Sequence, residues 1–260
     1  MKLARPDGAE IAWYDEGAGA PVLLIMGLAY PAAAWFRQVP VLAKQHRVLT
    51  VDNRGAGDTG LVPGSPYTVE AMAGDCLAVL DAAGAEQAHV VGISMGGLVA
   101  QELALCHPER VSSLALLATH PGMANWVLPQ EVIDFLTTRM TMDAEARGAF
   151  SIPFNYDPST PRGLIDEDWA ARAAGTAGPE GYAAQGGTAL WSGWDRLPSL
   201  QPRTLVMHGA GDRLVVPDNG RLLAERIPGA RWVEIPAANH ILTTDQAELV
   251  NSTLLDWFAA

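Results

Sequence analysis

A serine stands between two glycines in the stretch Gly92-Ile93-Ser94-Met95-Gly96. An apolar run at 88–93 precedes it and a helical pattern at 95–106 follows it, which is the context that the G-x-S-x-G pattern needs. A serine on such a tight strand-to-helix turn has a strained backbone, so the residues two positions away must lack bulky side chains. This context argues against an incidental serine in a glycine-rich turn. The pattern predicts that Ser94 is the nucleophile of an acyl-transfer reaction.

Two residues near the end of the chain are candidates for the acid and the base that a serine nucleophile requires. Asp212 follows the apolar run 204–207, and His240 follows the run 232–235 through a short loop. Because the carboxyl ends of parallel strands meet along one edge of a sheet, we expect both side chains to lie near Ser94. An aspartate after glycine is usually a turn residue, but of six histidines only His240 follows Asp212 in the chain. We therefore predict a triad of Ser94, Asp212 and His240.

The negative charge that develops during attack on a carbonyl needs two converging N–H donors. One is expected from Met95, because the helix that begins there directs its N–H groups and its positive dipole end at the nucleophile. The other is expected from Leu28, in the loop after the run 22–26, where Gly27 allows a sharp turn.

Further residues are expected to line the substrate pocket. They lie near strand ends or are tryptophans of the middle of the chain: Gly27, His120, Trp126, Trp191 and Ile241. Packing is the alternative role for His120 and for the two tryptophans. No Cys, His or carboxylate cluster has the spacing of a metal site, and the glycines around Ser94 fit neither a P-loop nor a dinucleotide-binding loop. We expect no metal and no cofactor.

The elements that must position these residues follow from the distribution of apolar residues. Continuous rather than alternating apolar runs indicate strands covered on both faces, as in a parallel sheet between two layers of helices. Two short alternating stretches, 1–5 and 9–14, precede runs at 22–26, 48–51, 88–93, 114–118, 204–207 and 232–235. We predict an α/β fold with a mostly parallel, eight-stranded sheet and helices on both faces.

Helical spacing separates these strands. Apolar residues at 69, 72, 76, 79 and 80 indicate a helix over 69–80, and the stretch 95–106 is apolar around much of its circumference, as a buried central helix would be. The last helix is expected to begin at Asp245, because Glu248 three positions later would complete a capping box.

The alternation of strands and helices stops near residue 121 and resumes near residue 194. Between these points lie helical patterns at 131–142 and 167–174, but no convincing strand. We interpret residues 121–193 as a helical cap that is inserted into a core formed by residues 1–120 and 194–260.

The charge and composition of the chain limit its partners. A net charge of −12, from 17 basic and 29 acidic residues, disfavours binding to nucleic acid or to an anionic membrane surface. No apolar stretch is long enough to span a membrane, and residues 1–8 lack the apolar segment of a signal peptide. Cys76 and Cys106 have neither metal nor redox spacing and are expected to be free, buried thiols. We expect a cytoplasmic monomer or homodimer that acts on a small-molecule substrate.

The chain resembles the α/β-hydrolase superfamily, and within it the group of capped esterases and enol-lactonases. The resemblance is carried by Ile25-Met26-Gly27-Leu28, Asp52-Asn53-Arg54-Gly55, Gly92-Ile93-Ser94-Met95-Gly96-Gly97, His208-Gly209-Ala210-Gly211-Asp212 and Ala238-Asn239-His240. The order of nucleophile, acid and histidine along the chain is also that of the superfamily. Where the superfamily often has His-Gly after the third strand, this chain has Met26-Gly27. Relatives with an aspartate nucleophile are disfavoured because Ser94 holds that position.

The resemblance implies hydrolysis of a small, largely apolar carboxylic ester or lactone through an acyl-enzyme. The same triad also serves hydrolases of C–C and thioester bonds, since all these reactions begin with addition to a carbonyl. A third hypothesis keeps the fold without hydrolysis, as a small-molecule receptor or a tailoring protein. The intact triad counts against this third hypothesis.

Overall fold

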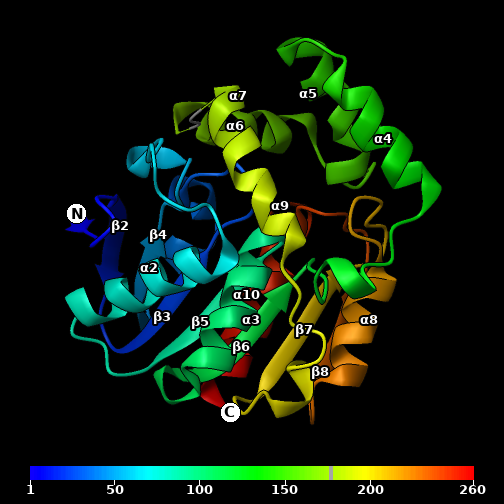
Figure 1. The fold of residues 1–260 in the computed structure, drawn as a ribbon. Helices are drawn as coiled ribbons and strands as arrows, with labels where there is room; N and C mark the ends of the chain where they lie inside the picture. The colour runs from blue at the N-terminus through cyan, green and yellow to red at the C-terminus, as the bar shows by residue number, and fades with distance from the viewer. Residues whose placement is uncertain (176–177) are drawn as a thin grey trace.

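The computed structural model describes residues 1–175 and 178–260, and its centre is an eight-stranded sheet (Figure 1). The strands follow the order β1-β2-β4-β3-β5-β6-β7-β8 across the sheet. The β1–β2 and β2–β4 pairs are antiparallel, and every pair from β4 to β8 is parallel, which confirms the predicted fold class. The strands are β1 (Lys2–Ala4), β2 (Glu10–Gly17), β3 (Ala20–Ile25), β4 (His46–Val51), β5 (Ala88–Ile93), β6 (Val111–Leu117), β7 (Thr204–Gly209) and β8 (Arg231–Ile235).

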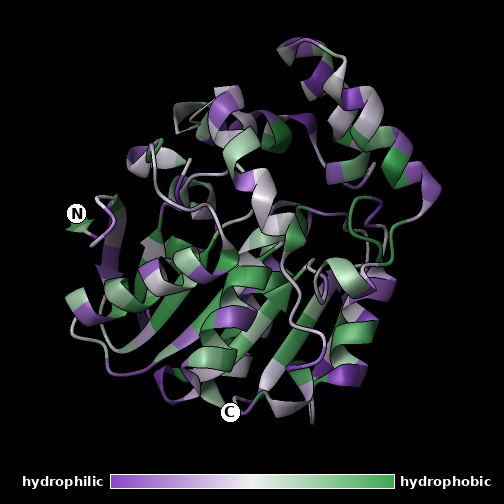
Figure 2. Ribbon diagram, in the orientation of Figure 1, coloured by the Kyte–Doolittle hydropathy of each residue, from purple (hydrophilic) through white to green (hydrophobic). Residues whose placement is uncertain are grey.

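The central strands coincide with the continuous apolar runs of the sequence. β7 is buried along its whole length and β5 along nearly all of it, because helices cover both faces of the sheet (Figure 2). In the register of the sheet, Ile25 pairs with Gly92, and Ile93 pairs with Leu117. The carboxyl ends of β3, β5 and β6 are therefore level, and the loops that follow them meet at one edge.

Two layers of helices bury the two faces of the sheet. Side chains of α2, α3 and α8 belong to one apolar cluster, and side chains of α1 and α10 belong to the other, across the sheet. No helix within 1–175 and 178–260 is long and apolar enough to cross a membrane. These helices are α1 (Val39–Leu42), α2 (Val69–Ala82), α3 (Met95–Cys106), α8 (Pro217–Arg226) and α10 (Ala247–Ala259), and the shorter α9 spans Leu242–Asp245. Short 3-10 turns occupy Ala32–Trp35, Gly57–Thr59, Pro108–Arg110, Met123–Asn125, Gly186–Leu190 and Leu197–Ser199.

Four helices of the segment 121–193 lie together above the sheet in Figure 1. They are α4 (Gln130–Met140), α5 (Ala144–Asn155), α6 (Arg162–Ala174) and α7 (Gly178–Gln185). The two ends of the segment meet where Gly122 and Ser192 form an isolated antiparallel bridge. The segment thus leaves and re-enters the rest of the chain at one place. We propose that residues 121–193 form a cap.

The expectations for Asp245 and for Cys106 are wrong. The last helix begins at Ala247 rather than at Asp245, so no capping box forms. The Asp245 carboxylate instead accepts hydrogen bonds from the backbone N–H groups of Asn239 and Asp157, and so fastens two loops together. Of the two free cysteines, Cys76 is buried as expected, but Cys106 is exposed because it lies on the outer side of the last turn of α3.

Candidate active site

Ser94 occupies the turn between β5 and α3 with a strained backbone. Its φ of 54° and ψ of −122° lie in a region that costs a side-chain-bearing residue about 1–3 kcal/mol. The flanking glycines make the turn possible, because a Cβ on Gly92 would lie 2.2 Å from the Gly96 carbonyl oxygen. The Thr119 hydroxyl donates to the Ser94 carbonyl oxygen at 2.7 Å and helps to hold the turn. These contacts therefore hold Ser94 in the turn at the edge of the sheet where the loops after β3, β5 and β6 meet.

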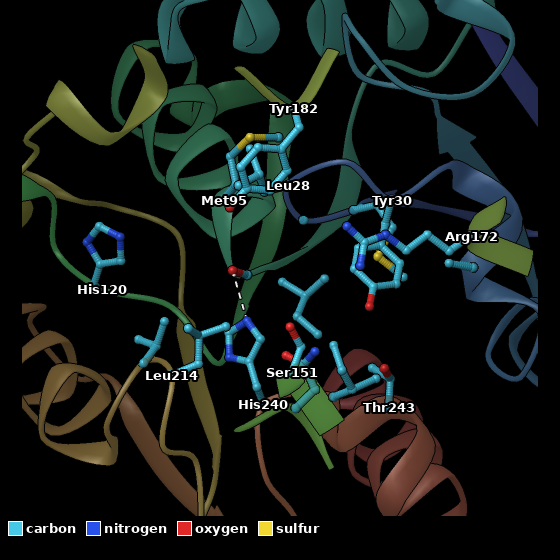
Figure 3. A pocket seen from close by; sticks show the side chains of 18 of the residues that line it. Leu28, Tyr30, Met95, His120, Ser151, Arg172, Tyr182, Leu214, His240 and Thr243 are labelled. Carbon is cyan, nitrogen blue, oxygen red and sulfur yellow. Dashed lines mark hydrogen bonds between the residues drawn. The ribbon is translucent and has the colours of Figure 1, made fainter. Parts of the chain in front are cut away.

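The three predicted triad residues meet in one chain of hydrogen bonds. His240 Nε2 lies 3.1 Å from Ser94 Oγ, the contact drawn as a dashed line in Figure 3. His240 Nδ1 lies 2.9 Å from Asp212 Oδ2. The imidazole is thus oriented by a carboxylate on one side and faces a hydroxyl on the other, which is the arrangement for activating a serine.

Asp212 is a buried carboxylate with a full set of hydrogen-bond donors. Its Oδ1 accepts from the backbone N–H groups of Leu214 and Val215, each at 2.9 Å. His208 Nε2 lies 3.2 Å from Asp212 Oδ2 and 2.6 Å from the Val215 carbonyl oxygen. His208 therefore packs between the carboxylate and the loop that follows it. Burial alone would raise the pKa of Asp212, but the two histidines outweigh it and lower the pKa to about 2. Asp212 therefore stays ionised beside His240.

The loop that carries His240 is tied to the segment 121–193. The Asn239 side chain donates to the Tyr156 carbonyl oxygen at 2.8 Å, and the Ile241 N–H donates to the Asn155 carbonyl oxygen at 2.8 Å. Asn239 belongs to one of the segments that carry the superfamily resemblance, but the partner of its side chain, Tyr156, lies 83 residues away. Periodicity and motifs give no signal for such distant contacts.

The predicted oxyanion donors are the backbone N–H groups of Leu28 and Met95. Within the described part of the chain, neither the Leu28 nor the Met95 N–H has a hydrogen-bond acceptor. The loop of Leu28 packs directly on the nucleophile, because a Cβ on Gly27 would lie 3.2 Å from the Ser94 Cβ. The arrangement is the one expected of an oxyanion hole.

A cavity of about 190 Å³ opens beside Ser94 and His240. Four of the five expected pocket residues line it: Gly27, His120, Trp126 and Ile241. Trp191 does not. Its indole N–H donates to the Glu102 carboxylate at 2.8 Å, and its ring packs in the core, so the expectation for Trp191 is corrected.

His120 forms part of the cavity wall as a neutral side chain. Its ring stacks on Trp126, with centroids 4.3 Å apart, and its Nδ1 accepts from the Gly122 N–H at 3.2 Å. Burial, together with the nearby histidines His240 and His208, lowers the pKa of His120 to about 4. The imidazole is therefore uncharged near neutral pH.

Charged and polar side chains also line the cavity. The sequence analysis did not predict these residues. Arg139 donates to the Tyr182 hydroxyl at 2.7 Å, and the Arg172 guanidinium lies 4.6 Å from the centre of the Tyr30 ring. In the view of Figure 3, Tyr30 and Arg172 lie across the cavity from His120. Helical periodicity placed these arginines on helices but did not indicate that they face the triad.

No group of three or more His, Cys, Asp or Glu residues in the described ranges could hold a metal ion. The hydrogen-bonded chain Asp212–His240–Ser94 can support nucleophilic chemistry at the Ser94 hydroxyl.

The chain matches the family model of the α/β-hydrolase fold over residues 20–245 and belongs to this family. It is 32% identical to a RutD protein of Azorhizobium caulinodans whose assignment as a carbamate hydrolase is provisional, over 98% of this chain and 97% of the relative. It is 30% identical to a pimeloyl-[acyl-carrier protein] methyl ester esterase of Aeromonas hydrophila, over 86% of this chain and 89% of the relative. Among solved structures, an enol-lactonase from Burkholderia xenovorans LB400 matches with a TM-score of 0.82 and 26% identity, over 100% of both chains.

Proposed function

We propose that this protein hydrolyses a compact carboxylic ester or lactone through an acyl-enzyme on Ser94. The observation that carries the proposal is the hydrogen-bonded chain Asp212–His240–Ser94, which ends in a cavity lined by Leu28 and Met95, whose N–H groups have no acceptor among the described residues. The three relatives support it, because they are named for a carbamate, a methyl ester and an enol-lactone.

In the first half of the proposed reaction, Ser94 Oγ attacks the substrate carbonyl while His240 Nε2 takes the hydroxyl proton. Asp212 holds the imidazole in the required tautomer and stabilises the imidazolium that forms. His240 then passes the proton to the leaving alkoxide, the C–O bond breaks, and the acyl group remains on Ser94. For a lactone, the leaving alcohol stays attached to the acyl group.

In the second half, water replaces the leaving group. His240 takes a proton from the water while the resulting hydroxide attacks the acyl carbonyl, and the proton then returns to Ser94 Oγ as the acid departs. Both tetrahedral intermediates place a negative oxygen between the Leu28 and Met95 N–H groups. Losing one such donor costs roughly 3–4 kcal/mol of transition-state stabilisation.

The cavity favours a compact substrate. Its volume of about 190 Å³ is below the roughly 300–1,000 Å³ that is typical of sites for drug-sized ligands. Apolar side chains such as Leu98, Leu214 and Ile241 form much of the wall, while Arg139 and Arg172 add polar contacts. We propose a substrate that is largely apolar around the reacting carbonyl.

A serine-reactive fluorophosphonate tests the proposal. Incubation of the wild-type protein at neutral pH, followed by mass spectrometry of its peptides, is expected to place one adduct on Ser94. Absence of this adduct would instead favour a receptor or tailoring protein on the same fold.

Matched ester, lactone, carbamate, thioester and β-diketone substrates then test the bond that is cleaved. Steady-state rates are expected to be highest for the ester or the lactone. Ester and lactone turnover orders of magnitude slower than turnover of the thioester or the β-diketone would overturn the choice of bond.

A further inference from the structure

The turn that carries Leu28 has a form that its own sequence does not favour. The Tyr30 N–H donates to the Gly27 carbonyl oxygen at 3.2 Å, and Ala29 between them has a φ of 62°. A positive φ at the third position of a four-residue turn is typical of type II turns, where glycine or asparagine normally stands. Ala29 therefore needs contacts from elsewhere to keep this conformation.

The side chain of Gln185 supplies such a contact. Gln185 ends helix α7 of the cap and is fully buried. Its Oε1 accepts from the Ala29 N–H at 2.6 Å, and its Nε2 donates to the Arg54 carbonyl oxygen at 2.7 Å. Because both ends of the amide are engaged, the side chain has one defined orientation and fixes the Leu28–Ala29 peptide.

The other end of this bridge is rigid. The Arg54 guanidinium donates to both carboxylate oxygens of Asp75, at 2.6 and 2.8 Å, within the core. The next residue, Gly55, packs against α7 so closely that a Cβ on it would lie 3.1 Å from the Gly181 carbonyl oxygen. Gln185 thus links the turn to a part of the core that cannot easily shift.

We propose that Gln185 is a positioning residue that sets the oxyanion hole from the cap. Without its acceptor, Ala29 can relax to negative φ, which rotates the peptide next to Leu28 and moves the Leu28 N–H out of line with the Met95 N–H. The inference rests on the proposed function, since it assigns the consequence of this bond to the hydrolytic step. It makes the cap a contributor to transition-state stabilisation as well as a cover for the cavity.

Substitution Gln185→Met tests the proposal, because methionine has a similar length but neither accepts from Ala29 nor donates to Arg54. With p-nitrophenyl acetate, kcat is expected to fall about 10- to 100-fold, while KM changes by less than about threefold. The inhibition constant of phenylboronic acid, which forms a tetrahedral adduct with serine, is expected to rise by a similar factor.

Asn219→Leu is the matched control. Asn219 is also a fully buried amide that joins the core to the cap, through hydrogen bonds with the N–H and carbonyl of Val127 at 2.8 and 3.0 Å. This variant is expected to lose thermal stability as Gln185→Met does, but to keep kcat within about twofold of wild type.

Hydrogen exchange supplies a readout that does not depend on turnover. Exchange of the amides in a peptide covering residues 27–32 is expected to accelerate about tenfold or more in Gln185→Met and to stay unchanged in Asn219→Leu. If the wild-type protein hydrolyses none of the substrates but exchange is still faster in Gln185→Met, the proposed function is refuted. The link between Gln185 and the turn that carries Leu28 is then retained. Unchanged exchange, wild-type kcat in Gln185→Met, or an equal loss of kcat in Asn219→Leu would overturn the inference.

Discussion

At the scale of single residues, Ser94, Asp212 and His240 were predictable because each follows a strand of the parallel sheet and Ser94 sits in a specific motif. The structure brings their side chains into one hydrogen-bonded chain, and their catalytic role stays a prediction. Gln185 gives no such signal, because a glutamine at the end of a helix is ordinary until its distant partners Ala29 and Arg54 are known. Trp191 was misplaced for the same reason, since its partner Glu102 lies 89 residues away.

The pH dependence of hydrolysis belongs to this scale. A general base must be neutral to accept a proton, so kcat/KM is expected to fall as the pH is lowered from 8 to 5. His120 also lines the cavity, but its pKa of about 4 keeps it neutral over this range. The decrease of kcat/KM at low pH should therefore be retained in His120→Gln. A wild-type kcat/KM that does not change between pH 8 and pH 5 would contradict the account.

At the scale of elements, the turn between β5 and α3 shows how packing and chemistry are joined. A serine can hold its strained φ only because Gly92 and Gly96 let the helix approach the strands. Sequence patterns predicted this turn and both flanking elements. They failed at the start of α10, because the Asp245 carboxylate bonds to Asn239 and Asp157 instead of capping a helix.

Substitution Gly96→Ala tests the close packing of α3. The added Cβ would lie 2.2 Å from the Ile25 carbonyl oxygen, so the backbone must shift. We expect the free energy of unfolding, measured by urea denaturation, to fall by about 1–3 kcal/mol. Gly163→Ala in α6 is the control: a Cβ there meets nothing within 4 Å, so its stability should be unchanged or slightly higher. Equal stability of the two variants would be evidence against the packing argument.

At the scale of the whole molecule, the order of apolar runs sufficed to predict a mostly parallel sheet between two layers of helices. The interpretation of residues 121–193 as a cap rested only on a break in this alternation, and it stays a prediction. Helical patterns alone do not indicate which side chains of that segment face the sheet. Arg139 and Arg172 show what these patterns miss, since both side chains line the cavity from α4 and α6.

Global stability should depend on pH through two buried site residues. The pKa of His120 falls from its ordinary 6.5 to about 4 on folding, and that of Asp212 falls from 3.8 to about 2. In each case the unfolded chain binds the proton first as the pH drops, so stability is lost with acidification. His120 contributes a loss of about 3 kcal/mol between pH 6.5 and 4, and Asp212 adds a further loss below pH 4.

Urea denaturation at pH 7, 5 and 4 measures this loss. His120→Gln should show a smaller decrease of the unfolding free energy between pH 7 and 4 than wild type. An identical decrease in both proteins would rule out His120 as its source.

The central claim is that the Ser94 hydroxyl is the nucleophile of a hydrolytic reaction, and Ser94→Ala tests it most directly. For an ester that the wild type hydrolyses, kcat/KM is expected to fall at least about 10³-fold, because no other group replaces the lost Oγ. The thermal midpoint of unfolding should stay close to that of wild type, since the substitution removes one oxygen and no core contact. Turnover comparable to wild type in the folded Ser94→Ala protein would contradict the account.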